Sequence, residues 1–243
     1  MRAADSRLSD EARRVRIITQ QVRLGAGQFR VIRPAVPLHN GALYDTGHHY
    51  DIYVDKTDGQ RIGALWLLAA RSPRSLVYLP MRATPPAPGV NVDWHQQQRR
   101  DLPLDMVLCH HSLQFPPSRW KQIRQKITAG NAPFTPQTAR VPDTDLPADD
   151  DIDYRTMNRR DNHDVLRQRV HAETLFLTGS ALAFRESARH FFTVTQEGPP
   201  AAAGPLYISG SCNYHVCRQL YWPDLDLREG QDIHIEYCPS WTK

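Results

Sequence analysis

The segment at residues 108–115 carries the most recognisable chemistry in the sequence, because His110 and Ser112 lie two positions apart in it. In an extended strand, side chains two positions apart project from the same face, so both could contact one phosphate group. The imidazole would give or take a proton, and the hydroxyl would donate a hydrogen bond. We therefore predict His110 and Ser112 as catalytic residues, in a strand that runs through residues 105–115.

This His-x-Ser pattern resembles one half of the paired His-x-Ser/Thr signature of the two-histidine phosphoesterases. The resemblance covers residues 108–115 only, and it implies a histidine-dependent phosphodiesterase or nuclease that acts on RNA ends or cyclic nucleotides. That mechanism needs two such elements on opposing strands, one histidine acting as base and the other as acid. The chain has eleven histidines, and only His110 is followed by Ser or Thr at the second position. The alternative is that His110 is a packed or hydrogen-bonded structural residue.

Positive charge is concentrated at the start of the chain, although the formal net charge is only +4. The first forty residues contain eight arginines against Asp5, Asp10 and Glu11. Guanidinium groups bind phosphate oxygens, so this bias favours an anionic partner such as RNA or another single-stranded nucleic acid. Arginines that line the solvated face of a helix are the alternative explanation. The arginines that we predict to bind nucleic acid are Arg13, Arg14, Arg16, Arg23, Arg30 and Arg33.

The remaining histidines and the cysteines occur without the spacing of a known metal motif. His234 and Glu236 alternate in a predicted strand and could share an ion, but the chain has no His-Glu-x-x-His and no Cys-x-x-Cys. The pair His48–His49 and the single His215 have no diagnostic spacing either. We therefore predict no metal ligands and no bound cofactor. Reduced, buried thiols are expected at Cys109, Cys212, Cys217 and Cys238.

Periodicity predicts the elements that would position these residues. Apolar residues three and four positions apart predict an amphipathic helix over residues 6–24, which Gly25 and Gly27 would end. Asp58-Gly59 has the composition of a hairpin turn between two strands. The predicted strands in this part of the chain lie at residues 50–54, 62–68 and 75–79.

The second part of the chain begins with a short helix after Pro117, in which Trp120, Ile123 and Ile127 share one face. Residues 131–153 contain four prolines and six aspartates, so this segment is predicted to be a linker. The other predicted elements are a helix at 161–177 and strands at 191–195, 206–222 and 231–238.

These elements together predict an α+β protein. It would have an N-terminal amphipathic helix, an antiparallel β-rich body, a Pro/Asp-rich linker and a C-terminal part of mixed helix and strand. The predicted domains are residues 1–130 and 154–243, joined by the linker at 131–153. The sequence has no secretory signal and no apolar stretch of membrane-spanning length, so a soluble cytoplasmic protein is expected.

The predicted function is nucleic-acid binding with a preference for RNA or single strands, extended by phosphodiester cleavage at His110. The alternative function is a non-enzymatic protein–protein adaptor or inhibitor. In that case the arginines would complement an acidic protein partner rather than a phosphate backbone.

Overall fold

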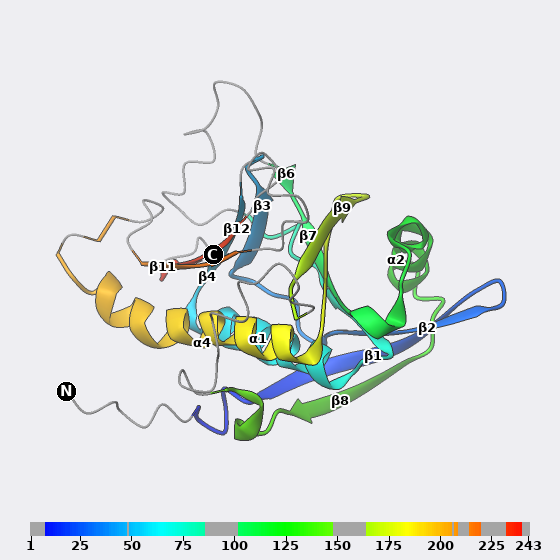
Figure 1. Cartoon of the computed structure of the whole chain (residues 1–243), viewed down its shortest axis with the longest axis horizontal. Helices are drawn as coiled ribbons and strands as arrows, with labels where there is room; N and C mark the ends of the chain where they lie inside the picture. Colours follow the sequence, from blue (N-terminus) through cyan, green and yellow to red (C-terminus); the bar gives the residue numbers. More distant parts are fainter. Residues whose placement is uncertain are drawn as a thin grey trace.

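A computed structural model describes residues 8–47, 49–85, 102–147, 164–205, 207–208, 214–219 and 232–239. These residues form two mixed β-sheets with two long helices between them (Figure 1). Helices and strands both contribute to the core, so the predicted α+β class is confirmed. Within the described ranges, no helix combines the length and the hydrophobicity that a membrane span needs.

The larger sheet has seven strands, with parallel pairing between β2 and β5 and between β7 and β10. The β1–β2 hairpin turns at Gly25, whose φ of +58° is a conformation that glycine adopts at no steric cost. In spatial order the strands are β8 (Phe134–Arg140), β1 (Arg14–Leu24), β2 (Gly27–Pro34), β5 (Ser75–Leu79), β7 (Asp105–His110), β10 (Thr174–Gly179) and β9 (Arg167–His171).

The smaller sheet has five strands, and its second strand β12 pairs in parallel with β4 and antiparallel with β11. In spatial order the strands are β11 (His215–Gln219), β12 (Asp232–Tyr237), β4 (Tyr50–Val54), β3 (Gly41–Asp45) and β6 (Leu102–Pro103).

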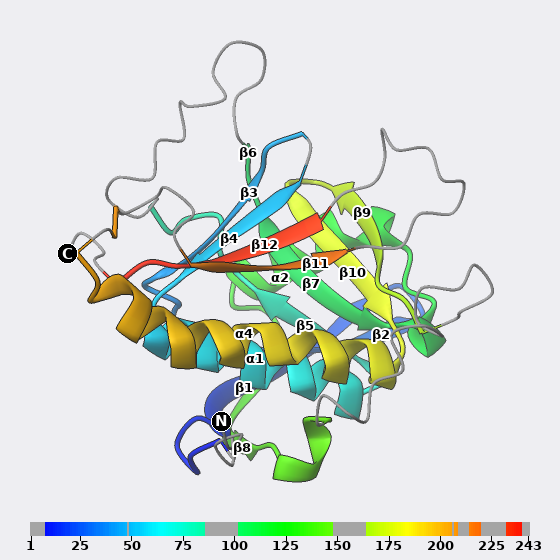
Figure 2. The same ribbon diagram turned by 60° about the vertical axis from the view of Figure 1, so that its left-hand side comes forward.

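Two long helices, α1 (Lys56–Arg71) and α4 (Ala181–Ala202), lie side by side (Figure 2). Asp55 caps α1 and Ser180 caps α4, and each side chain accepts a hydrogen bond from the backbone amide three positions later. α1 contacts β1, β5 and β7 of the larger sheet, whereas α4 contacts β11 and β12 of the smaller sheet. The helix pair therefore joins the two sheets into one hydrophobic core.

Glycines bring the two helices close together. A Cβ atom on Gly59 of α1 would lie 2.5 Å from Thr195 Cγ2 of α4, and one on Gly63 would lie 2.9 Å from the Phe192 ring. On the same helix, the Trp66 indole donates a 2.7 Å hydrogen bond to Ser187 Oγ of α4. Small residues at two positions of α1 thus set the distance between the helices.

A third helix, α2 (Trp120–Thr128), covers the other face of the larger sheet. Trp120, Ile123 and Ile127 are its buried residues, which confirms the helix predicted after Pro117. Because α1 covers one face and α2 the other, the central strands are buried on both sides. Three short 3₁₀ helices complete the described elements: η1 (His111–Leu113), η2 (Pro117–Arg119) and η3 (Asp143–Asp145).

The order of elements repeats once along the chain, although the sequence shows no internal repeat. The hairpin β3–β4, helix α1 and the antiparallel pair β5–β7 are followed later by the hairpin β9–β10, helix α4 and the antiparallel pair β11–β12. We call these two sets of elements the first and the second unit. The two units pair with each other, because β7 of the first unit is parallel to β10 of the second, and β12 of the second unit is parallel to β4 of the first. Each sheet therefore contains one antiparallel strand pair from each unit.

The predicted N-terminal helix is wrong, because residues 14–24 form the long strand β1 and residues 8–13 are an irregular stretch that ends in a turn. Val15 and Ile17 face the α1 side of the sheet, whereas Val22 faces the α2 side. Because the buried face changes along the strand, apolar residues occur on both faces, and Val15, Ile18 and Val22 fall three and four positions apart as in a helix.

Two predicted strands lie inside helices. Residues 62–68 belong to α1, and Asp58-Gly59 forms its first turn rather than a hairpin. Residues 191–195 belong to α4, where their β-branched and aromatic side chains pack against α1 and the smaller sheet. The residues of α1 from Ile62 to Ala70 are all buried, so this helix has no polar face that would reveal its period.

The helix predicted at 161–177 is also wrong. Its described residues form β9 and most of β10, joined by a turn in which Ala172 and Glu173 have positive φ values. Residues 161–163 lie outside the described ranges. The strands predicted at 50–54, 75–79 and 231–238 are confirmed, the last as β12, and β11 lies within the segment predicted as a strand at 206–222.

Part of the predicted linker belongs to the sheet. Residues 134–140 form β8, which pairs with β1 along its whole length. Asp145 of η3 is buried and contacts Arg71 of α1 and Arg185 of α4. The larger sheet also combines strands from both predicted domains.

Candidate functional site

Metal-ligating side chains gather on the face of the smaller sheet that is turned away from α4. Alternation along β12 buries Ile233 and Ile235 on the helix side and directs His234 to the outer side. In the strand register, His234 lies opposite Asp51 of β4 and opposite Cys217 of β11. Asp51, His234 and Cys217 therefore form one row across three adjacent strands.

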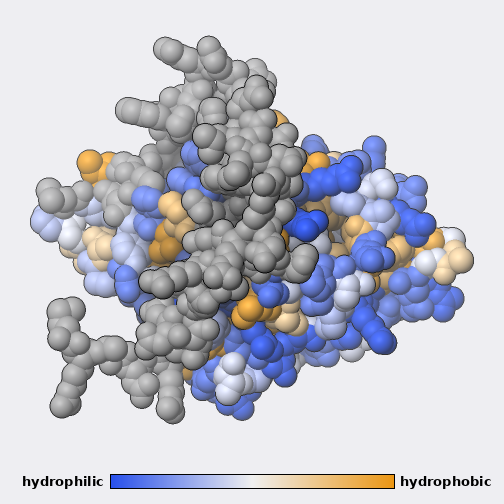
Figure 3. All heavy atoms as spheres, in the orientation of Figure 1, coloured by the Kyte–Doolittle hydropathy of each residue, from blue (hydrophilic) through white to orange (hydrophobic). Residues whose placement is uncertain are grey.

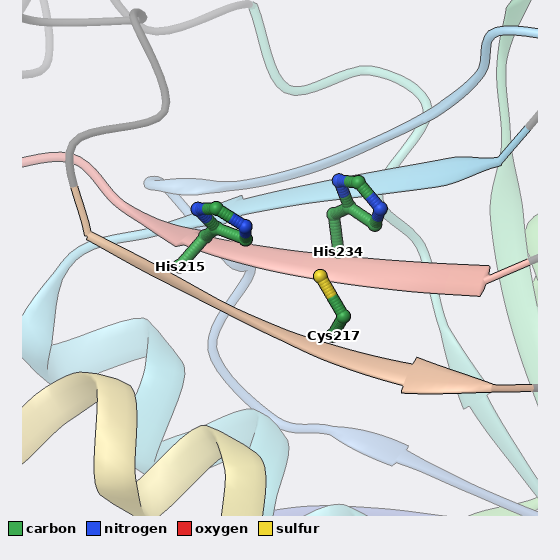
Figure 4. A group of neighbouring side chains, drawn as sticks. All are labelled: His215, Cys217 and His234. Carbon is green, nitrogen blue, oxygen red and sulfur yellow. The ribbon is translucent and has the colours of Figure 1, made fainter.

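Two more histidines extend this row. His49 lies two positions before Asp51, and His215 lies two positions before Cys217, so each shares the outer face with its neighbour. Figure 4 shows His215, Cys217 and His234 on the same side of β11 and β12, with the sulfur directed toward His234. The potential ligand atoms of these three residues lie within 4.8 Å of one another, as do those of His49, Asp51 and His234.

The Asp51 carboxylate faces two of the imidazole rings. Its Oδ1 atom lies 3.2 Å from His49 Nε2 and 3.7 Å from His234 Nδ1. Its Oδ2 atom accepts a hydrogen bond from the Tyr53 hydroxyl at 3.4 Å. Asp51 can therefore orient both rings, although its distance to His234 is longer than a normal hydrogen bond.

The three imidazole rings form a stack with His234 in the middle. The ring centroids of His49 and His234 are 4.3 Å apart, and those of His215 and His234 are 5.5 Å apart. Burial, together with His49 and His215, lowers the pKa of His234, against a smaller opposite effect of Asp51. His234 is therefore neutral at neutral pH, and a neutral imidazole keeps a lone pair that can bind a metal ion.

Cys217 is an exposed free thiol in electronegative surroundings. Partial burial, followed by the carboxylates of Asp232 and Asp51, raises the pKa of this thiol. Catalytic cysteines have the opposite environment, in which nearby cations stabilise the thiolate. A metal cation would supply the missing positive charge, because coordination deprotonates a thiol.

Two kinds of chemistry fit the residue types in this row. Cys217, His234 and Asp51 have the order of nucleophile, base and orienting carboxylate. His215, Cys217 and His234 also provide the nitrogen and sulfur donors of a transition-metal site. The carboxylates that flank Cys217 disfavour a free thiolate and attract a cation, so the surroundings support metal binding better than nucleophilic catalysis.

The predicted catalytic pair occupies a different place. β7 ends at His110, and Ser112 lies in η1, so the two residues do not share one face of a strand. His110 Nδ1 lies 2.8 Å from Ser112 Oγ and accepts the backbone N–H of Ser112 at 3.3 Å. The neutral ring therefore carries its proton on Nε2, and its one lone pair is already used. His110 acts as the cap of η1, and this geometry leaves it no free lone pair for a base.

The six predicted arginines do not lie on one surface. Strand alternation and the β1–β2 register place Arg14, Arg16 and Arg33 on the α2 side of the larger sheet. The same register places Arg23 and Arg30 on the opposite side. A single continuous basic surface, which the sequence-based prediction required, is therefore absent from these six positions.

Two of these arginines form ion pairs within the protein. Arg13 contacts Asp143 at 2.8 Å and Asp10 at 3.6 Å. Arg14 contacts Asp10 at 2.5 Å. Only part of the predicted positive charge is therefore available to a partner.

The three histidines of the cluster have no spacing in the sequence that groups them, and Asp51 and Cys217 were not predicted as their partners. Glu236, the residue proposed to share an ion with His234, belongs to neither group of potential ligands. One local signal was available, because His215 and Cys217 alternate in a strand segment in the same way as His234 and Glu236.

Comparisons with known proteins do not assign the chain to a family. No family model matches it, and neither a curated protein nor a solved structure matches it. The function must therefore be inferred from the geometry of the site.

Proposed function

We propose that this protein binds a divalent transition-metal ion of the zinc class through His215, Cys217 and His234. The proposal depends on one observation, the approach of two imidazoles and one thiol from adjacent strands to within 4.8 Å of one another. Nitrogen and sulfur are the donor atoms that zinc prefers, and three protein ligands leave one coordination position for water or a substrate.

Asp51 is proposed as a positioning residue rather than as a ligand. It faces Nδ1 of His234, which leaves the other ring nitrogen of His234 available to the metal. Histidines that bind metals commonly donate their second N–H to a carboxylate, and this contact fixes the orientation of the ring. The Tyr53 hydroxyl would in turn hold the carboxylate in place.

Metal binding requires the stacked rings to turn. Parallel rings have parallel lone pairs, whereas the lone pairs of tetrahedral ligands converge on the ion. Zinc–nitrogen and zinc–sulfur bond lengths place neighbouring ligand atoms about 3.3–3.8 Å apart in a tetrahedron. Rotation about the broad second torsion of histidine is the expected movement, since the strands already bring the side chains together.

Titration with Zn²⁺ and Co²⁺ tests the proposal directly. Protein purified without a histidine tag and treated with a chelator should bind one equivalent of either ion. The Co²⁺ complex should show a thiolate-to-metal charge-transfer band, because Cys217 is a ligand. Asp51→Asn should keep this band while weakening the affinity about 10- to 100-fold, as expected for a residue that orients a ligand.

Three variants separate this site from non-specific binding. Cys217→Ser should abolish the charge-transfer band, and His234→Ala should abolish stoichiometric binding. His171→Ala is the matched control, because His171 lies at the end of β9 in the other sheet. Absence of uptake by the wild type, or an equal loss of affinity in His171→Ala, would exclude the proposed ligands.

Phosphodiester cleavage by His110 and a cytoplasmic location stay separate predictions. The occupied Nδ1 lone pair of His110 does not favour catalysis by this residue. Turnover of a 2′,3′-cyclic nucleotide by the wild type and its loss in His110→Ala would establish a catalytic role. Equal rates in both proteins would remove that role.

A further inference from the structure

Four arginines lie on one part of the larger sheet, far from the cluster on the smaller sheet. Arg14, Arg16 and Arg33 share the α2-side face of β1 and β2, and Arg140 of the edge strand β8 lies directly opposite Arg14. We call these four residues the basic strand face. α2 covers the other end of the same face, next to Val22.

Two of these arginines are available to a ligand. Arg14 and Arg140 share the Asp10 carboxylate, which they contact at 2.5 and 2.6 Å. Arg16 and Arg33 form no ion pair with any of the described residues. Arg16 is exposed, and Arg33 is half-buried.

A buried glutamine holds Arg33 in place. Gln20 is only 1% exposed, and its Oε1 atom accepts a 2.8 Å hydrogen bond from Arg33 Nε. Among the described residues, no other partner holds the two terminal nitrogens of this guanidinium, so they can donate to an anion. Because the side chain is fixed before binding, less conformational entropy is lost when a ligand binds.

An exposed aromatic ring lies on the same face. Phe134 of β8 is paired with Gln20 of β1 in the strand register, and its side chain is 61% exposed. All but one residue of β8 are exposed, and the surface over β1, β2 and β8, at the lower right of Figure 3, is largely hydrophilic. Phe134 is therefore a large apolar group in a polar and basic surrounding.

We propose that the basic strand face binds single-stranded nucleic acid, with Arg16 and Arg33 contacting phosphates and Phe134 stacking on a base. Single-strand binding surfaces combine a positively charged track with aromatic side chains, and base stacking on such a ring does not depend on sequence. An acidic protein segment would pair with the arginines but would not require an exposed aromatic ring beside them. The nucleic acid is therefore the ligand that the whole surface favours.

The chain provides a matched control for the charge. Arg16→Ala combined with Arg33→Ala removes two positive charges from the basic strand face. Arg23→Ala combined with Arg30→Ala removes two charges from the same two strands but from the opposite side of the sheet. The two double variants have the same net charge, so any difference between them reports the location of the binding surface.

Fluorescence anisotropy of a labelled oligo(dT) measured over a series of salt concentrations tests the proposal. Wild-type protein should bind with an affinity that falls as salt rises. Loss of two phosphate contacts in the Arg16/Arg33 double variant should reduce the slope of log K against log salt by about 1.4. The Arg23/Arg30 double variant should keep the wild-type slope.

Phe134→Ala gives an independent measurement, because removing an exposed side chain does not threaten folding. It should weaken binding about fivefold or more without changing the salt dependence. Failure of the wild type to bind at low salt, or equal losses in the two double variants, would overturn the proposal. Tighter binding of a labelled polyglutamate than of oligo(dT) would also overturn it, in favour of an acidic protein partner.

Discussion

Replacement of Gly59 by alanine should destabilise the protein even though alanine is the better helix former. The new methyl group would lie 2.5 Å from Thr195 Cγ2 and 3.1 Å from Val54 Cγ2, and both neighbours are buried. Alanine gains up to about 1 kcal/mol from helix propensity, whereas overpacking a core costs about 1–3 kcal/mol. We expect Gly59→Ala to lower the free energy of unfolding by about 1–2 kcal/mol.

A second substitution should reverse this loss. Thr195→Ser removes only the clashing methyl group and keeps the hydroxyl that donates to the Phe192 carbonyl. Alone it should cost about 1 kcal/mol, the value of one buried methyl group. The double variant should be nearly as stable as the wild type, because the cavity made by serine accommodates the alanine methyl.

Urea denaturation of the four proteins in this double-mutant cycle provides the assay. The coupling energy between the two substitutions should be about 2–3 kcal/mol in the favourable direction, with an unchanged dependence on urea. If Gly59→Ala is as stable as the wild type, or if Thr195→Ser adds its own loss without compensation, the close approach of α1 and α4 at this position is wrong.

Three further predictions concern other parts of the molecule. Asp145→Asn should cost about 1–3 kcal/mol in urea denaturation, because the buried carboxylate joins arginines of α1 and α4; no loss would show that η3 is not anchored there. Burial raises the pKa of Cys109 to about 11 from an ordinary value of 9.0. The unfolded chain therefore loses this proton first as pH rises, and stability should fall by up to about 2.7 kcal/mol between pH 9 and 11, an effect that Cys109→Ala should lack. Zn²⁺ at a hundredfold excess over its dissociation constant should add about 2.7 kcal/mol to the free energy of unfolding. It should also slow amide hydrogen exchange in β11, because two of the proposed ligands lie on this edge strand. Unchanged exchange in β11 would contradict the proposed ligands.

The fold was predictable where an element is short and bounded by turn residues, or where its buried residues recur at helical spacing. β4, β5 and β12 are short, apolar and bounded by turn residues, and their sequence signals identified them correctly. The helix α2 was predictable because Pro117 precedes it and its three buried residues recur at helical spacing. In these elements the local composition and the flanking residues agree with the final structure, so their sequence pattern is simple.

The elements that were predicted wrongly lack a simple local signal. β1 changes its buried face between Ile17 and Val22, and α1 is buried all round from Ile62 to Ala70. The β9–β10 turn places Ala172 and Glu173 at positive φ, without the glycine or asparagine that normally marks such a turn. In each case the tertiary structure overrides the local preference of the sequence.

The candidate metal site could not be assembled from spacing. Alternation along β12 correctly separated His234 from its buried neighbours. Its partners Asp51 and Cys217 come from β4 and β11, and only the order of strands in the sheet makes them adjacent. Ligands that alternate on different strands have no fixed separation along the chain, so a search for metal motifs does not find them.

The exchange of strand pairs between the two units also determines when the protein can fold during synthesis. β4 emerges early during synthesis, but its partner β12 emerges only when the ribosome has passed residue 237. Until then one edge of β4 has no partner strand, and α1 gains its partner helix α4 only after residue 202 has been added. Neither unit can complete a core by itself, so folding must wait for nearly the whole chain and depends on contacts between distant segments.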